Sequence, residues 1–183
     1  YSADFYLAKN VHSWNTTFSL NAGYTAFRSQ TLRQGRSLAY SGSLLSVYPT
    51  IHLRSLAWLS LRVRGIAELS TRTADLPNAK ATSHLNTWGT DVDLSILPIE
   101  DLELFYRLDL RSLPAESGPR TTRCFMDTGL RCHPARRVEL ELTVQNLTNA
   151  DRYTEIQYVD ADRFATTFHL RPLHALLTLK AAF

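Results

Sequence analysis

The sequence predicts an all-β fold, an antiparallel transmembrane β-barrel, and three observations favour it. Apolar and polar side chains alternate along almost every segment, as in strands whose two faces meet different surroundings. The mean hydropathy is −0.19, and no stretch contains the roughly 18 consecutive apolar residues of a membrane-spanning helix. The alternating runs are about 9–14 residues long, close to a tilted membrane crossing and well above the roughly 5–6 residues usual in soluble sheets.

Nine segments carry this alternation, and we expect each to form one strand. The clearest is 138–145, where four apolar residues alternate with Glu139, Glu141, Thr143 and Gln145. The segment 38–51 fits two registers because Leu44 and Leu45 are adjacent. The other expected strands are the run around Phe5 and Leu7 and the segments 14–27, 57–70, 88–96, 102–110, 123–131 and 173–183.

The connections between these segments alternate in length. Short turns are expected at 10–13, 53–55, 98–100 and 133–135, and long polar loops at 30–36, 73–80, 113–119 and 149–170. Short periplasmic turns and long external loops are typical of membrane barrels. If the C-terminus lies on the short-turn side, nine strands put Tyr1 on the long-loop side, so at least one further strand is expected before it. Residues 1–183 are therefore expected to be the C-terminal part of a larger barrel.

The composition argues against several other classes of protein. The net charge is +3, but the basic residues are dispersed and no nucleic-acid-binding motif is present, so no nucleic-acid partner is expected. Cys124 and Cys132 would lie about 26 Å apart on one strand, too far for a disulfide. Neither the cysteines nor the six histidines have the spacing of metal ligands, so we expect no metal and no cofactor.

The charged face of the strands has two interpretations. Paired carboxylates could perform acid–base catalysis. They could instead balance arginines on neighbouring strands of a polar lumen, and this is favoured because no nucleophile or Ser/His/Asp grouping accompanies them. We therefore predict no enzymatic activity. The carboxylates are Asp91, Asp93, Glu103, Asp109, Glu139 and Glu141, and the arginines are Arg62, Arg64, Arg107, Arg123 and Arg131.

The C-terminal segment ends on an aromatic residue, Phe183. Counting back in steps of two gives Ala181, Leu179 and Leu177, all apolar. This pattern resembles the signal by which the barrel-assembly machinery recognises outer-membrane proteins, and an aromatic residue also suits the interfacial girdle of a barrel. The alternative is a soluble edge strand that ends on Phe183 by chance.

A second resemblance lies upstream of the last strand. Asn146-Leu147-Thr148-Asn149 followed by Tyr153 looks like the passage before the final strand of TonB-dependent outer-membrane transporters. Leu170-Arg171-Pro172 resembles the SusC-like or carboxypeptidase-regulatory-like branch of that family. These degenerate motifs cover about the last 40 residues, and the strand rhythm of the whole chain agrees with them.

The resemblance implies a 22-stranded barrel in the bacterial outer membrane, filled by an N-terminal plug that engages TonB. This chain would supply roughly the last nine strands, with the plug and the earlier strands absent from it. The implied partners are outer-membrane lipid, the barrel-assembly machinery, TonB acting through the plug, and a surface lipoprotein. In the family the Asn-Leu-Thr stretch is structural, so no chemistry is assigned to it.

The implied function is uptake of a nutrient ligand with TonB-derived energy. The main alternative is a small structural or adhesive barrel without transport, and the sequence upstream of Tyr1 distinguishes the two. The last long loop carries aromatic and charged residues that could contact a ligand or could simply pack the loop. These candidate ligand contacts are Arg152, Tyr153, Tyr158, Asp160, Asp162 and Arg163.

Overall fold

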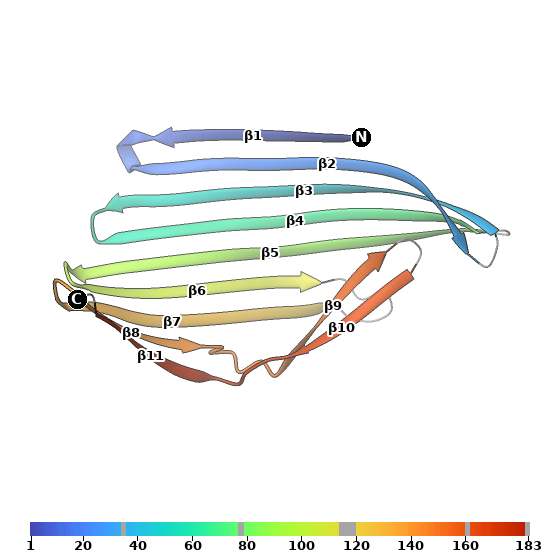
Figure 1. Cartoon of the computed structure of the whole chain (residues 1–183). Coiled ribbons are helices and arrows are strands. Elements are labelled where there is room, and N and C mark those ends of the chain that lie inside the picture. The colour runs from blue at the N-terminus through green and yellow to red at the C-terminus, as the bar shows by residue number, and fades with distance from the viewer. Residues whose placement is uncertain (34–35, 77–78, 114–119, 160–161, 182–183) are drawn as a thin grey trace.

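The computed structural model describes residues 1–33, 36–76, 79–113, 120–159 and 162–181. It contains a nine-stranded antiparallel sheet in the order β1-β2-β3-β4-β5-β6-β7-β8-β11 and a separate two-stranded hairpin, β9-β10 (Figure 1). The strands are β1 (Ser2–Val11), β2 (Thr16–Arg33), β3 (Arg36–Leu56), β4 (Leu59–Leu76), β5 (Ala79–Ile99), β6 (Leu102–Leu113), β7 (Thr121–Ala135), β8 (Val138–Gln145), β9 (Arg152–Val159), β10 (Asp162–His169) and β11 (His174–Ala181). The predicted all-β antiparallel class and the nine strands of the main sheet are confirmed.

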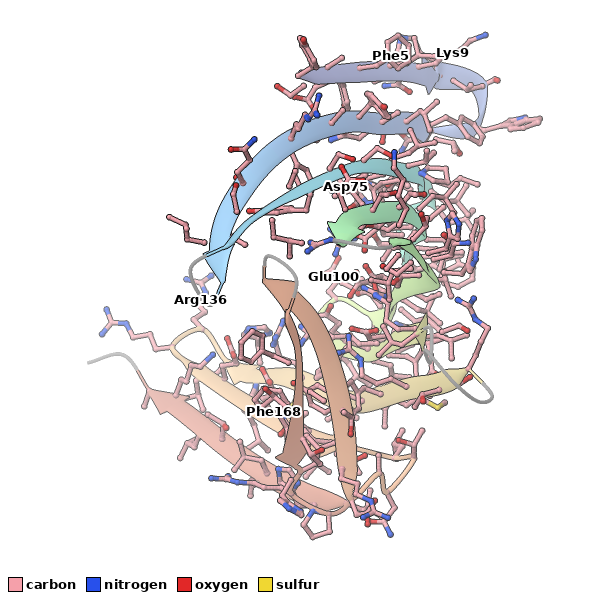
Figure 2. The ribbon with its side chains drawn as sticks, turned by 90° about the vertical axis from the view of Figure 1, so that its right-hand side faces the viewer. Phe5, Lys9, Asp75, Glu100, Arg136 and Phe168 are labelled. Carbon is pink, nitrogen blue, oxygen red and sulfur yellow. The ribbon has the colours of Figure 1, made fainter. Side chains whose placement is uncertain are left out.

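The sheet is open, so the chain by itself is not closed into a barrel. Among the described strands, β1 pairs only with β2, and β11 pairs only with β8. Viewed along the strands, the sheet curves into a C, and the β9-β10 hairpin stands inside the concave side (Figure 2). Strand twist and coiling produce this curvature in long antiparallel sheets.

Most of two predicted loops belongs to strands. Residues 30–33 and 36 belong to β2 and β3, and most of 73–80 belongs to β4 and β5. In β4 and β5 the alternation reverses there, with small or apolar residues such as Ala74 and Ala81 on the concave face and polar residues on the convex face, and cross-strand polar pairs support the pairing. The Oγ1 atoms of Thr73 and Thr82 lie 3.1 Å apart, and Lys80 Nζ lies 3.7 Å from Asp75 Oδ1.

The predicted short turns are shorter still. The strands run on to Leu56, Ile99 and Ala135 before turning, and each of these three ends contains a register shift typical of a β-bulge. The first connection is a 3₁₀ turn, His12–Trp14, which ends at Asn15 in the left-handed conformation with a φ of 43°. The predicted loop 149–170 contains the β9-β10 hairpin, because alternating residues at 152–159 pair with 162–169.

The described residues contain almost no apolar core. Among these residues the only buried hydrophobic side chains are Leu38, Ile66 and Phe105, each of which is 6–8 % exposed. A soluble β-sandwich would bury one face of this sheet against a second sheet. No second sheet covers the apolar face of this one in the described part of the chain.

Candidate functional site: a charged wall opposite an uncharged band

The register sorts the side chains of the nine-stranded sheet into two different faces. Directly paired residues point to the same face, so each ladder of partners can be followed from β1 to β11. The pairing of β3 with β4 also settles the register of 38–51. Leu45 pairs with Leu69 and lies on the apolar face, whereas Leu44 pairs with Ser70 and lies on the opposite face.

The convex face carries an apolar band without Asp, Glu, Lys or Arg, bordered on β1 by Lys9, which pairs directly with Phe18. Many of its side chains are solvent-exposed in the isolated chain; Phe5 is 54 % exposed and Leu177 is 67 % exposed. The band consists of Ala3, Phe5 and Leu7 on β1, Phe18, Leu20, Ala22 and Tyr24 on β2, Leu45, Val47, Pro49, Ile51 and Leu53 on β3, Leu59, Leu61, Val63, Gly65, Ala67 and Leu69 on β4, Trp88, Thr90, Val92, Leu94 and Ile96 on β5, Leu102, Leu104, Tyr106, Leu108 and Leu110 on β6, Cys124, Met126, Thr128, Leu130 and Cys132 on β7, Val138, Leu140, Leu142 and Val144 on β8, and Ala175, Leu177, Leu179 and Ala181 on β11.

The apolar band runs obliquely across the strands. Its border toward the long connections is Tyr24 on β2 and Leu69 on β4, which share one row of partners. On β11 the border is Ala175, which lies in the row of Leu61, eight residues further along β4. Eight residues at about 3.3 Å each displace the border by about 26 Å along the strands. The seven strand spacings from β2 to β11, at about 4.8 Å each, span about 34 Å across the sheet. The strands are therefore inclined to the normal of the band by about 38°, within the range of roughly 35–45° found in barrels.

The thickness of the band follows from the same geometry. On β4 it extends from Leu59 to Leu69, about 33 Å along the strand. With a tilt of about 38°, this length corresponds to about 26 Å perpendicular to the band, close to the roughly 25 Å apolar belt of outer-membrane barrels. Beyond it, the convex face becomes polar, with Arg28, Asp75 and Lys80 on the extended parts of β2, β4 and β5.

The concave face carries a wall of ion pairs on β4–β8 and β11. Arg62 donates from Nε and Nη2 to Asp93 Oδ2 at 2.9 and 2.5 Å. Arg111 bridges Asp91 and Asp109 at 2.8 and 3.1 Å. Arg131 contacts Glu103 and Glu141, both at 2.9 Å. This charged wall comprises Arg62, Arg64, Asp91, Asp93, Glu103, Arg107, Asp109, Arg111, Arg123, Asp127, Arg131, Glu139, Glu141 and Lys180.

The wall supports the predicted balance of charge. Each of the six carboxylates singled out from the sequence has a basic partner within 4 Å. Arg111 and Lys180, which sequence reasoning did not single out, take part as well: Lys180 Nζ lies 2.8 Å from Glu139 Oε1. Among the described residues, no group of three or more His, Cys, Asp or Glu could hold a metal ion.

Glycines let large side chains lie close to the backbone on the concave face. A Cβ on Gly129 would lie 2.3 Å from Phe105 Cζ and 2.6 Å from the carbonyl oxygen of Leu142. A Cβ on Gly42 would lie 2.7 Å from Phe27 Cζ. These aromatic rings therefore cover the backbone of the neighbouring strand at the glycine, an arrangement known to stabilise glycines in sheets.

The β9-β10 hairpin is fastened to the charged wall by an aromatic clasp of Arg123, Phe125, Tyr153 and Phe168. The Tyr153 ring stacks on Phe168 at 4.9 Å between ring centroids and meets Phe125 edge-on at 5.7 Å. The Arg123 guanidinium lies 5.2 Å from the ring centroids of both Phe125 and Tyr153. Arg123 also lies 3.4 Å from Asp109, so the clasp joins the ion-pair network.

Of the predicted ligand contacts, the structure describes the side chains of Arg152 and Tyr153, which lie in different surroundings. Tyr153 packs in the clasp, whereas Arg152, next to it in the strand, has a side chain that is 69 % exposed and lies 4.0 Å from Asp151. The backbone pairs Tyr158 with Arg163 and Val159 with Asp162. The side chains of Tyr158, Asp162 and Arg163, and the whole of Asp160, lie outside the described residues. Tyr153 thus packs within the protein, and the ligand contacts stay a prediction.

The Asn146–Asn149 turn is a structural clamp. Asn146 adopts a φ of 56°, and its side-chain Nδ2 donates to the carbonyl oxygens of Ala150 and Arg171 at 2.8 and 2.7 Å. Thr148 Oγ1 donates to the carbonyl of Cys124, and Asn149 Oδ1 accepts from the backbone N–H of Leu173. The turn therefore ties the end of β8 to β7 and to the segment that enters β11.

The predicted assembly signal is partly described. Leu177, Leu179 and Ala181 lie on the convex face of β11, where Leu177 pairs with Leu142 and Leu179 pairs with Leu140. Leu179 is 66 % exposed, so it is available to another molecule. Phe183 lies outside the described residues.

In comparisons with known proteins, no family model, curated protein or solved structure matches the chain. In the described ranges, no helix has the length and apolar character needed to span a membrane.

Proposed function

We propose that this chain is part of a β-barrel in the bacterial outer membrane, with the apolar band against lipid and the charged wall lining the lumen. The observation that carries the proposal is the uncharged band across all nine strands. Opposite it lies a wall in which every charge except those of Arg107 and Asp127 has an oppositely charged partner within 4 Å among the described residues. Its thickness of about 26 Å and strand tilt of about 38° match such a barrel. No covering sheet in the described residues competes with lipid for this face.

Closure of the proposed barrel requires further strands. Because neighbouring strands alternate in direction from β1 to β8 and on to β11, β1 and β11 run the same way. A wholly antiparallel barrel therefore needs an odd number of strands between β11 and β1. This agrees with the proposal of a larger barrel, to which the chain contributes nine strands.

Within that architecture, we propose a TonB-dependent receptor that takes up a nutrient ligand. The support is the resemblance of Asn146–Tyr153, Leu170-Arg171-Pro172 and the closing strand to that family, together with the clamp that Asn146 and Asn149 form before β11. The proposed partners are lipid, the barrel-assembly machinery, TonB and a surface lipoprotein. A small structural barrel without transport is the second candidate, favoured only by the ion-paired wall, which needs no ligand.

Spin labels on the full-length protein in bilayers test the membrane location. Cys124 and Cys132 are first replaced by Ser, and single cysteines are then placed at Val63, Leu108 and Thr73. We expect oxygen, which concentrates in lipid, to reach labels at Val63 and Leu108, and a polar nickel reagent to reach the label at Thr73. Equal access of the nickel reagent to all three positions would refute the membrane proposal.

Transport requires a separate test. Growth on candidate nutrients is compared between cells that carry or lack the gene, each with and without TonB. Uptake that depends on both genes supports the transporter. Uptake unaffected by TonB, together with a signal peptide directly before Tyr1, favours the structural barrel instead.

A further inference from the structure

One cation of the charged wall has no acidic partner within the described residues. Arg107 on β6 is solvent-exposed, and its guanidinium lies over the Phe105 ring, 5.3 Å from the ring centroid. Every other arginine or lysine of the wall lies within 4 Å of a carboxylate. Within the described part of the chain, Arg107 is thus the one cation of the wall without a carboxylate partner.

The register explains why Arg107 is left over. Its direct neighbours on the concave face are Asp93 on β5 and Asp127 on β7. Asp93 is occupied by Arg62, which makes two hydrogen bonds to one of its oxygens. Asp127 accepts the backbone N–H of Asn146 at 2.9 Å, as part of the turn that clamps the end of β8. Both carboxylates beside Arg107 are therefore engaged elsewhere.

Arg107 also lies where the wall is hollowed. Two adjoining hollows on the concave face share Arg62, Asp93 and Arg107 among their lining residues. The first extends over Ser60 and Ser95 toward Phe105, whereas the second extends toward Arg111 and Phe125 and is also lined by Asp91, Asp109 and Asp127. A small anion is therefore better suited to the first hollow, whose lining contains fewer acids, and from there it can reach the Arg107 guanidinium.

We propose that Arg107, with Arg62 beside it, binds the carboxylate of a small organic acid on the concave face. A guanidinium offers two parallel N–H donors that match the two oxygens of a carboxylate. A doubly charged anion such as phosphate is less suitable, because Asp93 and Glu103 line the same hollow and repel additional negative charge. The hydroxyls of Ser60 and Ser95 provide polar surroundings for the rest of the solute.

This inference concerns the concave face alone and does not require membrane insertion or transport. It therefore fails or succeeds independently of the proposed function. A site of one exposed arginine is weak, so the assay must detect millimolar binding.

The test uses saturation-transfer NMR on the full-length protein in detergent, with propionate as the probe and propionamide as its uncharged match. We expect a saturable propionate signal and none from propionamide. Arg107→Gln should reduce the propionate signal at least fivefold, and Arg107→Lys should retain part of it, since charge remains but the paired donors are lost. Arg136→Gln, in the turn between β7 and β8, is the matched control and should leave the signal unchanged.

Asp93→Asn provides a change in the opposite direction. It removes the negative charge that holds Arg62, so propionate affinity should rise about threefold, a gain that misfolding cannot produce. The proposal is overturned if propionate and propionamide bind alike, or if Arg107→Gln and Asp93→Asn both leave propionate binding unchanged. It is also overturned if competition shows that phosphate binds the site more tightly than propionate does. Absence of a saturable propionate signal in the wild type also overturns it.

Discussion

The apolar band predicts that the cost of a buried charge depends on depth along one strand. On β4, Val63 lies near the middle of the band, Leu69 lies at its border, and Thr73 lies beyond it on the same face. In a bilayer, arginine should cost about 2–4 kcal/mol at Val63, about 0–1 kcal/mol at Leu69 and close to zero at Thr73. The distance from Val63 to Leu69 along the strand is about 20 Å, or about 16 Å toward the interface at the inferred tilt.

The measurement is urea unfolding of the full-length protein in lipid vesicles, with Val63→Arg, Leu69→Arg and Thr73→Arg compared with the wild type. The wild-type chain should also require detergent or lipid to stay in solution. Equal costs at the three positions would contradict the membrane assignment of the convex face. A monomer that remains soluble without detergent would do the same, because the band would then need no apolar surroundings.

Three further changes test particular contacts. Gly129→Ala should destabilise the sheet by about 1–3 kcal/mol, because the new methyl group collides with Phe105 and with backbone; the same loss in a Phe105→Leu background would show that the ring is not responsible. Asn146→Ala should cost about 2–3 kcal/mol for its lost hydrogen bonds and positive φ, and Asn146→Gly should recover only the φ part, as measured by thermal unfolding. Tyr153→Ala removes two ring contacts and one cation–π contact, about 2 kcal/mol, so hydrogen exchange in β9 should accelerate about 30-fold while exchange in β4 stays unchanged.

The sequence predicted strands well wherever their two faces differ. For β8, the expected and observed bounds are the same, Val138–Gln145, because Leu and Val on one side oppose Glu and Thr on the other. The ends of β4 and β5 were missed because this pattern changes there. Thr71, Thr73 and Asp75 make the convex face of β4 polar, while Ala74 lies on the concave face, so the alternation reverses and no longer continues the apolar face of the preceding residues.

Contacts between distant segments lay beyond sequence reasoning. Whether Leu44 or Leu45 faces the apolar side was decided by the partner strand, since Leu45 meets Leu69. Tyr153 was singled out as a candidate ligand contact, but its packing against Phe125 depends on how the hairpin folds back over the sheet. Likewise, the charges near Arg107 were visible in the sequence, whereas the engagement of Asp93 and Asp127 by other groups was not.

The two faces of the sheet answer different physical demands. On the convex face the band carries no charge, and residues as different as Leu, Thr, Cys and Trp lie side by side in it. On the concave face most charges of the wall have an oppositely charged partner, because a charge removed from water is costly without one. Arg111 illustrates this, since it bridges Asp91 and Asp109 while lying across Gly89, where any Cβ would meet Arg111 Cδ at 2.7 Å. An alanine at Gly89 should therefore displace Arg111 and disturb both ion pairs, whereas an alanine at Thr90, one residue away on the convex face, should have little effect. The comparison isolates the charged wall from the apolar band within two adjacent residues of one strand.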